Sequence, residues 1–266
     1  MSTGYTSTID TYANLAAVKA AALRRSPAGF LAGAILAGTY IGIAMILAIS
    51  TGSGLAPGVR PLVMGATFGL GLILTVFAGA ELFTGYVMYL GFGLAKRTIG
   101  VSDAVKMIVV VWIGNLIGGL VLSAVFAAGG GGAVFANADT MFHAYVQHKV
   151  EASAVALMAR AILCNWLVCL AIWIAARMTG DAAKCIAMAW ILLAFVAAGF
   201  EHSVANMTAL TLGLLVPNPS IDVAGMVRNL AIVSLGNIIG GLVFVVGGYL
   251  AAAKTDVVPA KANTRR

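Results

Sequence analysis

The chain has 266 residues, of which 61% are hydrophobic and only 9% are charged, and its mean hydropathy is +1.02. So little polar surface cannot cover a water-soluble globule of this length, which indicates an integral membrane protein. The formal net charge is +7, but the basic residues are spread over predicted loops and termini and form no single stripe, so we expect no nucleic-acid partner.

Six charge-poor stretches are long enough to cross about 30 Å of hydrocarbon as helices. They predict an all-α fold with transmembrane helices at 28–50, 62–95, 107–128, 153–176, 185–215 and 229–251. No early stretch resembles a secretory signal, so we expect the N-terminus to be retained.

An even number of spans places both termini on one side of the membrane. That side carries twelve of the 16 Lys and Arg residues. Under the positive-inside rule we expect a cytoplasmic N-terminal segment (1–27), a transmembrane domain (28–252) and a cytoplasmic tail (253–266) in the cell inner membrane.

The second and fifth predicted spans are longer than the roughly 20 residues that a crossing needs. Each has a Gly-x-Glu motif near its middle, at Gly79–Glu81 and at Gly199–Glu201. We expect both spans to be broken at mid-membrane. Backbone freed there must be buried in protein or line a wet cavity, and the N-termini of half-helices offer partial positive charge to an anion.

A second motif repeats at nearly the same spacing. Gly114–Val121 reads Gly-Asn-Leu-Ile-Gly-Gly-Leu-Val, and Gly236–Val243 repeats it with one change at an offset of 122 residues, against 120 for the Gly-x-Glu pair. Two matches at nearly one offset predict a duplicated three-span unit, at about 28–128 and 153–251. Because three is odd, the second copy is inverted, an arrangement in which transport sites form near the midplane.

Glu201 and His202 stand together in a run that is otherwise uncharged from Ile186 to Ile221. Ionisable groups at membrane depth cost roughly 2.5–3.5 kcal/mol each on insertion scales, so they usually have a function. The alternative is a neutral histidine that is hydrogen-bonded to a neighbouring helix. The pair is the first functional-site candidate.

Three cysteines lie within or at the edge of apolar runs, at Cys164, Cys169 and Cys185. Their spacing matches neither a disulfide framework nor a metal site, so we expect buried free thiols and no bound metal.

Three stretches carry a more specific signature, in the order Phe77–Gly85, Leu163–Ala171 and Ala198–Met207. Together they resemble the formate/nitrite transporter family, and the last two look most like its nitrite channels. The resemblance implies an aquaporin-like fold assembled as a homopentamer, with one anion pathway in each subunit and no cofactor.

The resemblance also implies roles for individual residues. His202 would be the central pore histidine, and Thr84 its partner on the loop that interrupts the second span. Glu201 would hold the backbone near the histidine, and Lys149 would attract the anion at the periplasmic approach. From the residues alone, Thr84 could equally be a helix N-cap, and Lys149 an ordinary loop charge.

Polar contacts near the middle are implied for Asn165 and Asn237. We also expect Asn237 and Asn115 to bind the broken backbone, and the Glu81 and Glu201 carboxylates to accept hydrogen bonds from loop N–H groups. Hydrophobic constrictions above and below the histidine match four residues, Phe68, Leu72, Leu82 and Phe195. The role of Arg160, at the start of the fourth span, stays open.

A bare anion cannot cheaply cross a dry ring of Phe and Leu unless its charge is neutralised or matched. We therefore expect His202 to give a proton or a strong hydrogen bond to a weak-acid anion. Nitrite is the first candidate substrate, and formate and hydrosulfide are alternative substrates. A proton-coupled carrier is the alternative mechanism.

An enzyme is not expected, because a single deep histidine excludes a haem with two histidine ligands. An aquaglyceroporin would carry Asn-Pro-Ala motifs, and a purely structural protein would not need two broken helices.

Overall fold

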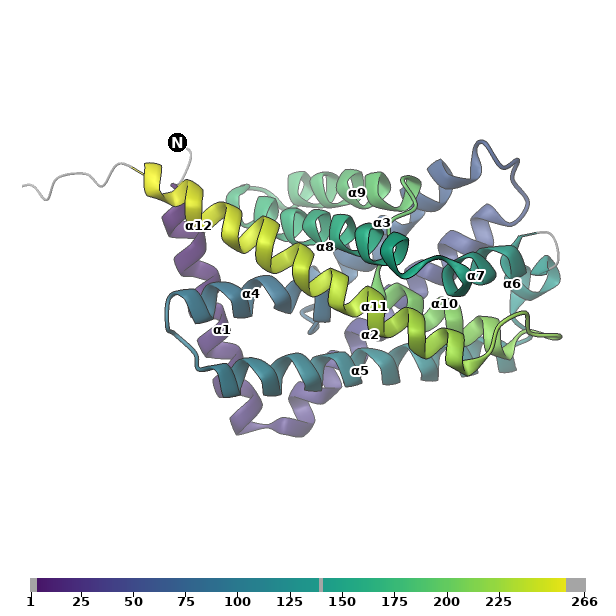
Figure 1. Ribbon diagram of the computed structural model, residues 1–266, viewed down its shortest axis with the longest axis horizontal. Coiled ribbons are helices and arrows are strands. Elements are labelled where there is room, and N and C mark those ends of the chain that lie inside the picture. The colour runs from purple at the N-terminus through teal and green to yellow at the C-terminus, as the bar shows by residue number, and fades with distance from the viewer. Residues whose placement is uncertain (1–3, 139–140, 257–266) are drawn as a thin grey trace, which may run out of the picture.

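The computed structural model describes residues 4–138 and 141–256, and all regular secondary structure in these ranges is helical (Figure 1). The α-helices, in chain order, are α1 (Tyr5–Arg25), α2 (Pro27–Gly52), α3 (Arg60–Ala78), α4 (Phe83–Ala95), α5 (Val101–Ala128), α6 (Gly132–Ala136), α7 (Phe142–Glu151), α8 (Ala154–Arg177), α9 (Asp181–Ala197), α10 (Ser203–Leu215), α11 (Val223–Ile239) and α12 (Gly248–Ala252). A π-helical stretch (Gly240–Gly247) joins α11 to α12, and a 3₁₀ turn (Ala253–Thr255) follows.

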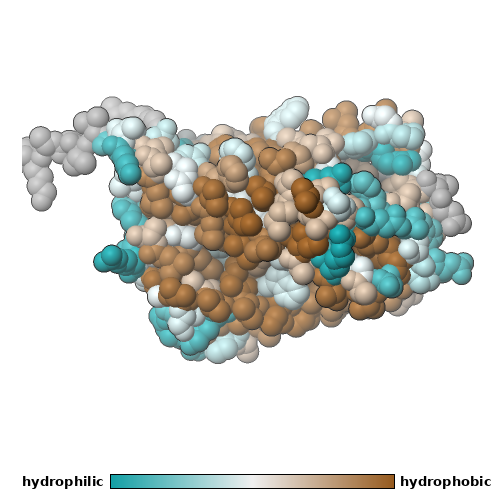
Figure 2. Space-filling model, in the orientation of Figure 1, coloured by the Kyte–Doolittle hydropathy of each residue, from teal (hydrophilic) through white to brown (hydrophobic). Residues whose placement is uncertain are grey.

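Within these ranges, five helical segments are long and apolar enough to cross a membrane, namely α2, α3, α5, α8 and the continuous run from α11 to Thr255. Helices α4 and α10 are also apolar but have only 13 residues each. Figure 2 shows a hydrophobic band across the middle of the molecule and hydrophilic residues at its two ends. This distribution is that of an integral membrane protein.

The second and fifth predicted spans each contain two helices. Helix α3 ends at Ala78 and α4 begins at Phe83, while α9 ends at Ala197 and α10 begins at Ser203. Gly79 has a φ of 79° and Gly199 a φ of 72°, in the left-handed region that glycine enters without the steric cost of a Cβ atom. The glycine of each Gly-x-Glu motif therefore ends a helix.

The short helices α4 and α10 extend towards opposite ends of the molecule. Helix α4 lies near α1 and α12, whereas α10 lies near α6 and α7 (Figure 1). The duplicated Gly-Gly motif brings long helices into close contact, because a side chain at Gly118 would overlap the carbonyl of Ile35 in α2, and one at Gly240 the carbonyl of Ile162 in α8. The motif is thus a helix-packing surface in both halves of the chain.

The two ends of the described chain meet at α1. Helix α1 has no capping side chain of its own, but the Asp256 carboxylate accepts hydrogen bonds from the N–H groups of Tyr5 (3.3 Å) and Thr6 (2.7 Å). An ion pair of 2.9 Å between Lys96 and Asp10 ties α1 to the end of α4. These contacts fix the position of a helix that contributes to the site described next.

Candidate functional site

A buried asparagine from α11 holds the interruption between α9 and α10. Asn237 Oδ1 accepts a hydrogen bond from the N–H of Ser203 at 2.9 Å. Its amide nitrogen donates to the carbonyls of Ala161 (2.9 Å) and Glu201 (3.0 Å). One side chain thus satisfies the Ser203 N–H and the Glu201 carbonyl, which the interrupted helix leaves without intrahelical partners, and ties them to α8 through the Ala161 carbonyl.

Asn115 of α5 makes the matching contacts at the first interruption. Its Oδ1 accepts from the N–H of Phe83 at 2.9 Å, and its amide nitrogen donates to the carbonyls of Ala34 (2.7 Å) and Glu81 (2.9 Å). The expected binding of broken backbone by Asn115 and Asn237 is confirmed. It also explains why the asparagine recurs in the duplicated motif.

Replacing Asn237 with leucine should lower the free energy of unfolding by about 2–4 kcal/mol, because several buried backbone groups lose their partners and each costs about 1–3 kcal/mol. Asn115→Leu should cause a similar loss, since its contacts match. Denaturant unfolding of the purified protein in detergent measures both. A loss below about 1 kcal/mol in either variant would contradict the clamping role.

His202 lies at the end of the second interruption and caps α10. Its Nδ1 accepts a hydrogen bond from the N–H of Ala205 at 3.1 Å. A ring nitrogen that accepts carries no proton, so the proton of the neutral ring is on Nε2. Nε2 lies 3.1 Å from Oγ1 of Thr84 and donates to it. The structure therefore brings together the two residues that the sequence pairs.

Thr84 lies inside the first turn of α4. The N-cap of this helix is Leu82, which makes no side-chain capping hydrogen bond, so the alternative interpretation of Thr84 as an N-cap is wrong. Asn165 of α8 is also buried, and its amide nitrogen donates to the carbonyls of Thr84 (3.2 Å) and Asn237 (2.7 Å). Asn165 therefore links the two halves of the chain through their backbone.

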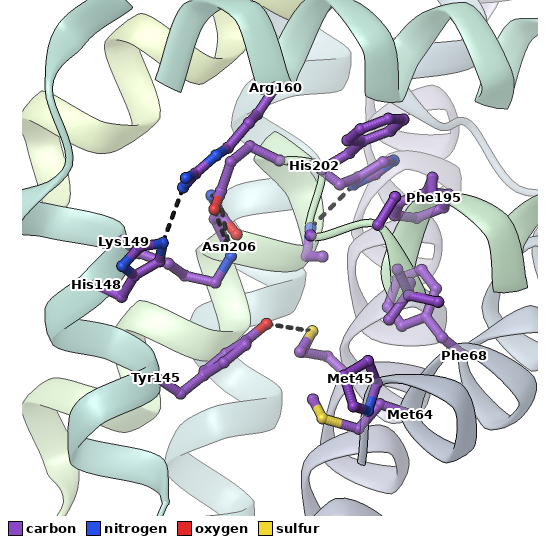
Figure 3. Close-up of a pocket in the computed structure, with 18 of the residues that line it drawn as sticks. Met45, Met64, Phe68, Tyr145, His148, Lys149, Arg160, Phe195, His202 and Asn206 are labelled. Carbon is purple, nitrogen blue, oxygen red and sulfur yellow. Dashed lines mark hydrogen bonds and ion pairs between the residues drawn. The ribbon is translucent and has the colours of Figure 1, made fainter. Parts of the chain in front are cut away.

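Apolar side chains enclose the histidine. The rings of Phe68 and Phe195 meet edge to face with centroids 5.5 Å apart, and Phe195 stacks on the imidazole of His202 at 6.0 Å. Leu72 and Leu82 are buried as well. All four residues assigned to constrictions thus lie in the interior, and Figure 3 shows Phe68 and Phe195 beside His202.

A cavity of about 480 Å³ reaches this apolar group from one side. His202, Phe68 and Phe195 line it, and Lys149 and Glu201 form part of its wall (Figure 3). We call it the Lys149 cavity. Its size suits a small anion together with several water molecules.

Lys149 is a buried member of an ion pair. Its ammonium nitrogen lies 3.1 and 2.9 Å from the two carboxylate oxygens of Glu201, and 4.9 Å from the ring centre of Tyr145. Burial opposes the charge on Lys149, but the Glu201 carboxylate and the Tyr145 hydroxyl together offset this and raise the pKa of the ammonium group above its ordinary value. Lys149 therefore stays charged, and its description as an ordinary loop charge is wrong.

The Glu201 carboxylate also accepts a hydrogen bond of 2.6 Å from the amide nitrogen of Asn206. Its partners are thus the side chains of Lys149 and Asn206. The expectation that it accepts from loop N–H groups is wrong, because Asn237 already binds the backbone of the interruption.

A second cavity, of about 340 Å³, is lined mainly by residues of α1, α3, α4 and α8. Leu72 and Leu82 line it together with Lys19 and Glu81, and we call it the Lys19 cavity. The ammonium nitrogen of Lys19 lies 2.6 and 2.8 Å from the two oxygens of Glu81, which also accepts a hydrogen bond from the Tyr86 hydroxyl at 2.8 Å. Here too the carboxylate binds side chains, and the expectation for Glu81 is wrong.

Sequence reasoning missed Lys19. It belongs to the predicted peripheral segment, and 62 residues separate it from Glu81, so no local pattern connects them. The signal that was present is the repeat of the Gly-x-Glu motif. Because its two glutamates are related by the repeat, a lysine partner for Glu201 implies a lysine partner for Glu81.

The arrangement consists of two cavities, each with a Lys–Glu pair in its wall. The first is lined by Phe68, Phe195 and His202, and the second by Leu72 and Leu82. Within residues 4–138 and 141–256 no group of three or more His, Cys, Asp or Glu is placed to bind a metal ion, and the three cysteines are free thiols. Such a site can bind an anion and offer it a hydrogen bond.

Comparisons with known proteins agree on one family. The family model described as formate/nitrite transporter matches residues 9–251. The nitrite transporter NirC of Salmonella typhimurium strain LT2 is 41% identical over 260 residues, which cover 97% of this chain and 96% of that protein.

Two solved structures share the fold. A chain described as an FNT family ion channel has a TM-score of 0.89 and 42% identity, covering 93% of this chain and 99% of its own. A pentameric formate channel with formate bound has a TM-score of 0.73 and 31% identity, covering 86% of this chain and 98% of its own.

Proposed function

The chain belongs to the formate/nitrite transporter family, whose members are transporters and channels and not enzymes, and from this premise we propose that it carries nitrite across the membrane through a pore in each subunit. The 41% identity to a nitrite transporter supports nitrite as the substrate. The similarity to a formate channel keeps formate as the second candidate. Hydrosulfide and a proton-coupled carrier mechanism remain alternatives of the same class.

The observation that carries this proposal is the position of the Nε2–H group of His202. In the proposal this hydrogen-bond donor lies at an apolar constriction between the two cavities. An anion that leaves the Lys149 cavity loses water at Phe68 and Phe195, which is costly unless another donor replaces that water. In the proposal His202 supplies this donor beside Phe195, and the passing anion replaces Oγ1 of Thr84, which orients the ring between passages, as the acceptor of the Nε2–H group.

The hydrogen-bond pattern favours donation of a hydrogen bond over donation of a proton. Nδ1 of His202 accepts from Ala205, so a doubly protonated ring would have to give up the cap of α10. A neutral ring has only its Nε2 proton, and losing it would leave an anionic ring. In our proposal the proton that forms the conjugate weak acid comes from a hydronium ion in the cavity, which is left as water, and His202 stabilises the anion by a hydrogen bond until it is protonated.

The placement of the chain in the membrane is part of the proposal. We count α3 with α4, and α9 with α10, as single interrupted spans, which gives six spans in an inverted aquaporin-like repeat. The matching contacts of Asn115 and Asn237 support this count. The basic residues near the termini support cytoplasmic termini and a periplasmic Lys149 cavity. Residues 1–3 and 257–266, including most of the proposed tail, lie outside the described ranges.

We expect the protein to form a homopentamer, as its similarity to a pentameric formate channel suggests. Native mass spectrometry in detergent should give the mass of five chains. A monomer or a tetramer as the dominant species would contradict this assembly.

The proposed transport is tested with proteoliposomes in a stopped-flow swelling assay. Nitrite should enter them at least tenfold faster than it enters protein-free liposomes, since lipid alone is a poor solvent for an anion. Parallel runs with formate and hydrosulfide rank the three candidates. A nitrite rate equal to that of protein-free liposomes would refute the proposed function.

Thr84→Val should slow nitrite flux about fivefold without unfolding the protein, because the shape is kept and one buried hydrogen bond of about 1 kcal/mol is lost. Since Thr84 acts by orienting His202, combining Thr84→Val with His202→Asn should add little to the loss caused by His202→Asn alone. Flux through the single and double variants measures this coupling. Fully additive losses would mean that the two residues act independently.

A further inference from the structure

The Lys149 cavity has an excess of positive charge. Among the residues that the structure describes, its lining contains three cationic side chains, Arg60, Lys149 and Arg160, and a single carboxylate, Glu201. Because the Lys149 ammonium group is bound by both oxygens of Glu201, these two charges largely cancel. The excess therefore lies on the two arginines.

Arg60 is committed to its own loop. Its Nε donates to the carbonyl of Gly52 at 3.2 Å, and its Nη2 donates to the carbonyl of Leu55 at 2.9 Å. These bonds hold the connection between α2 and α3. They also commit two of the three guanidinium nitrogens to backbone carbonyls. Arg60 is thus less able to bind an anion than Arg160.

Arg160 retains free donors over the cavity. Its Nη1 donates to Nε2 of His148 at 2.9 Å, and in the part of the chain that the structure describes no other hydrogen bond uses its five N–H groups. Figure 3 shows the Arg160 side chain crossing the top of the cavity towards His148 and Lys149. The edge of the guanidinium that does not meet His148 can bind a ligand.

The backbone of Arg160 is tied to the interruption that contains the pore histidine. Its carbonyl accepts a hydrogen bond from the N–H of Glu201 at 3.3 Å, and Glu201 directly precedes His202. An anion held by the Arg160 side chain is thus in the same cavity as His202, whose ring lines the opposite wall. The Lys149–Glu201 pair, whose charges largely cancel, lines the same cavity.

We propose that Arg160 captures the anion in the Lys149 cavity through two parallel hydrogen bonds, and that it thereby favours anions with two oxygens, such as nitrite and formate, over single-centre anions such as hydrosulfide. The inference rests on the proposed function and names the residue that selects its substrate. A guanidinium offers a planar pair of N–H groups that fits two oxygens at once, whereas an ammonium group is a point charge. Nitrite gains two contacts from Arg160, and hydrosulfide gains one.

His148 is a positioning residue in this account. Arginine has only donors, so Nε2 of His148 must be the acceptor. The contact fixes one edge of the guanidinium and leaves the other directed to the cavity. Glutamine at this position keeps an acceptor for Arg160, whereas alanine does not.

The test compares Arg160→Lys with Arg228→Lys. Both variants exchange a guanidinium for an ammonium group, but Arg228 binds the carbonyls of Val150 and Ala152 and does not line the cavity. Half-saturating concentrations for nitrite and for hydrosulfide are measured in proteoliposomes. Arg160→Lys should raise the value for nitrite about five- to tenfold and that for hydrosulfide less than twofold. Arg228→Lys should change neither.

Equal shifts of the half-saturating concentrations for nitrite and hydrosulfide in Arg160→Lys would show that the residue supplies charge alone. An unchanged value for nitrite would show that Arg160 does not bind the anion. Either result overturns the proposal.

If Arg160→Lys fails to fold, the two His148 variants decide. His148→Ala should raise the half-saturating concentration of nitrite two- to threefold and His148→Gln should not, whereas equal values in both variants and the unmodified protein overturn the inference. Unmodified protein that carries no nitrite refutes the proposed function itself; active protein with an unaltered Arg160→Lys variant refutes only this inference.

Discussion

His202→Asn should reduce nitrite flux about 10- to 100-fold while the protein remains folded. Asparagine is among the preferred N-cap residues, so its side-chain oxygen can replace Nδ1 as acceptor for the N–H of Ala205 and keep the cap of α10. It has no atom at the position of Nε2 and cannot reach Thr84. A hydrogen bond to a charged group contributes about 1.5–3 kcal/mol, which corresponds to this range of rates.

His202→Phe serves as the comparison. Phenylalanine fills the space of the ring but removes both the pore donor and the cap, so it should lose flux to the same extent and also lower the free energy of unfolding by about 1 kcal/mol. Flux in proteoliposomes and denaturant unfolding separate the two effects. If His202→Asn transports nitrite at the rate of the unmodified protein, the donor role of His202 is wrong.

The second large effect concerns stability. Lys149→Ala should lower the free energy of unfolding by about 3–5 kcal/mol, because it leaves the buried Glu201 carboxylate without its cation. Glu201→Gln alone should be destabilising for the same reason, since it leaves a buried ammonium group unpaired.

The double variant Lys149→Ala with Glu201→Gln is the control. It removes both charges and keeps an acceptor for the amide of Asn206, so it should be markedly more stable than either single change. Unfolding of all three variants in detergent measures the coupling. Losses that simply add would mean that the two charges do not depend on each other.

The sequence predicted the interruptions because their causes are local. A left-handed residue is needed where α3 and α9 end, and Gly79 and Gly199 mark these positions. The asparagine that holds each interruption lies in a duplicated motif, so Asn115 and Asn237 were also predictable. The link between His202 and Thr84 followed from the family resemblance, since 118 residues separate them.

The partners of buried charges were not predictable. Glu81 and Glu201 are adjacent to the interruptions, which suggested backbone donors for their carboxylates. The structure instead supplies cations from α1 and α7, two segments without a strong membrane signal. Likewise, Asn165 looked like a contact for the anion, but its amide nitrogen binds two backbone carbonyls. Such pairings depend on how distant segments pack.

The central claim is that the anion passes through the Lys149 cavity of each subunit, and blocking that cavity tests it most directly. Ala144 is exposed on α7 and lines the cavity, whereas Ala224 is exposed on α11 and does not. Ala144→Cys and Ala224→Cys are each combined with Cys185→Ser, because Cys185 is the native thiol that is only half-buried. After complete reaction with a bulky anionic thiol reagent, nitrite flux should fall at least tenfold in Ala144→Cys and stay unchanged in Ala224→Cys. Undiminished flux through fully reacted Ala144→Cys would contradict the account.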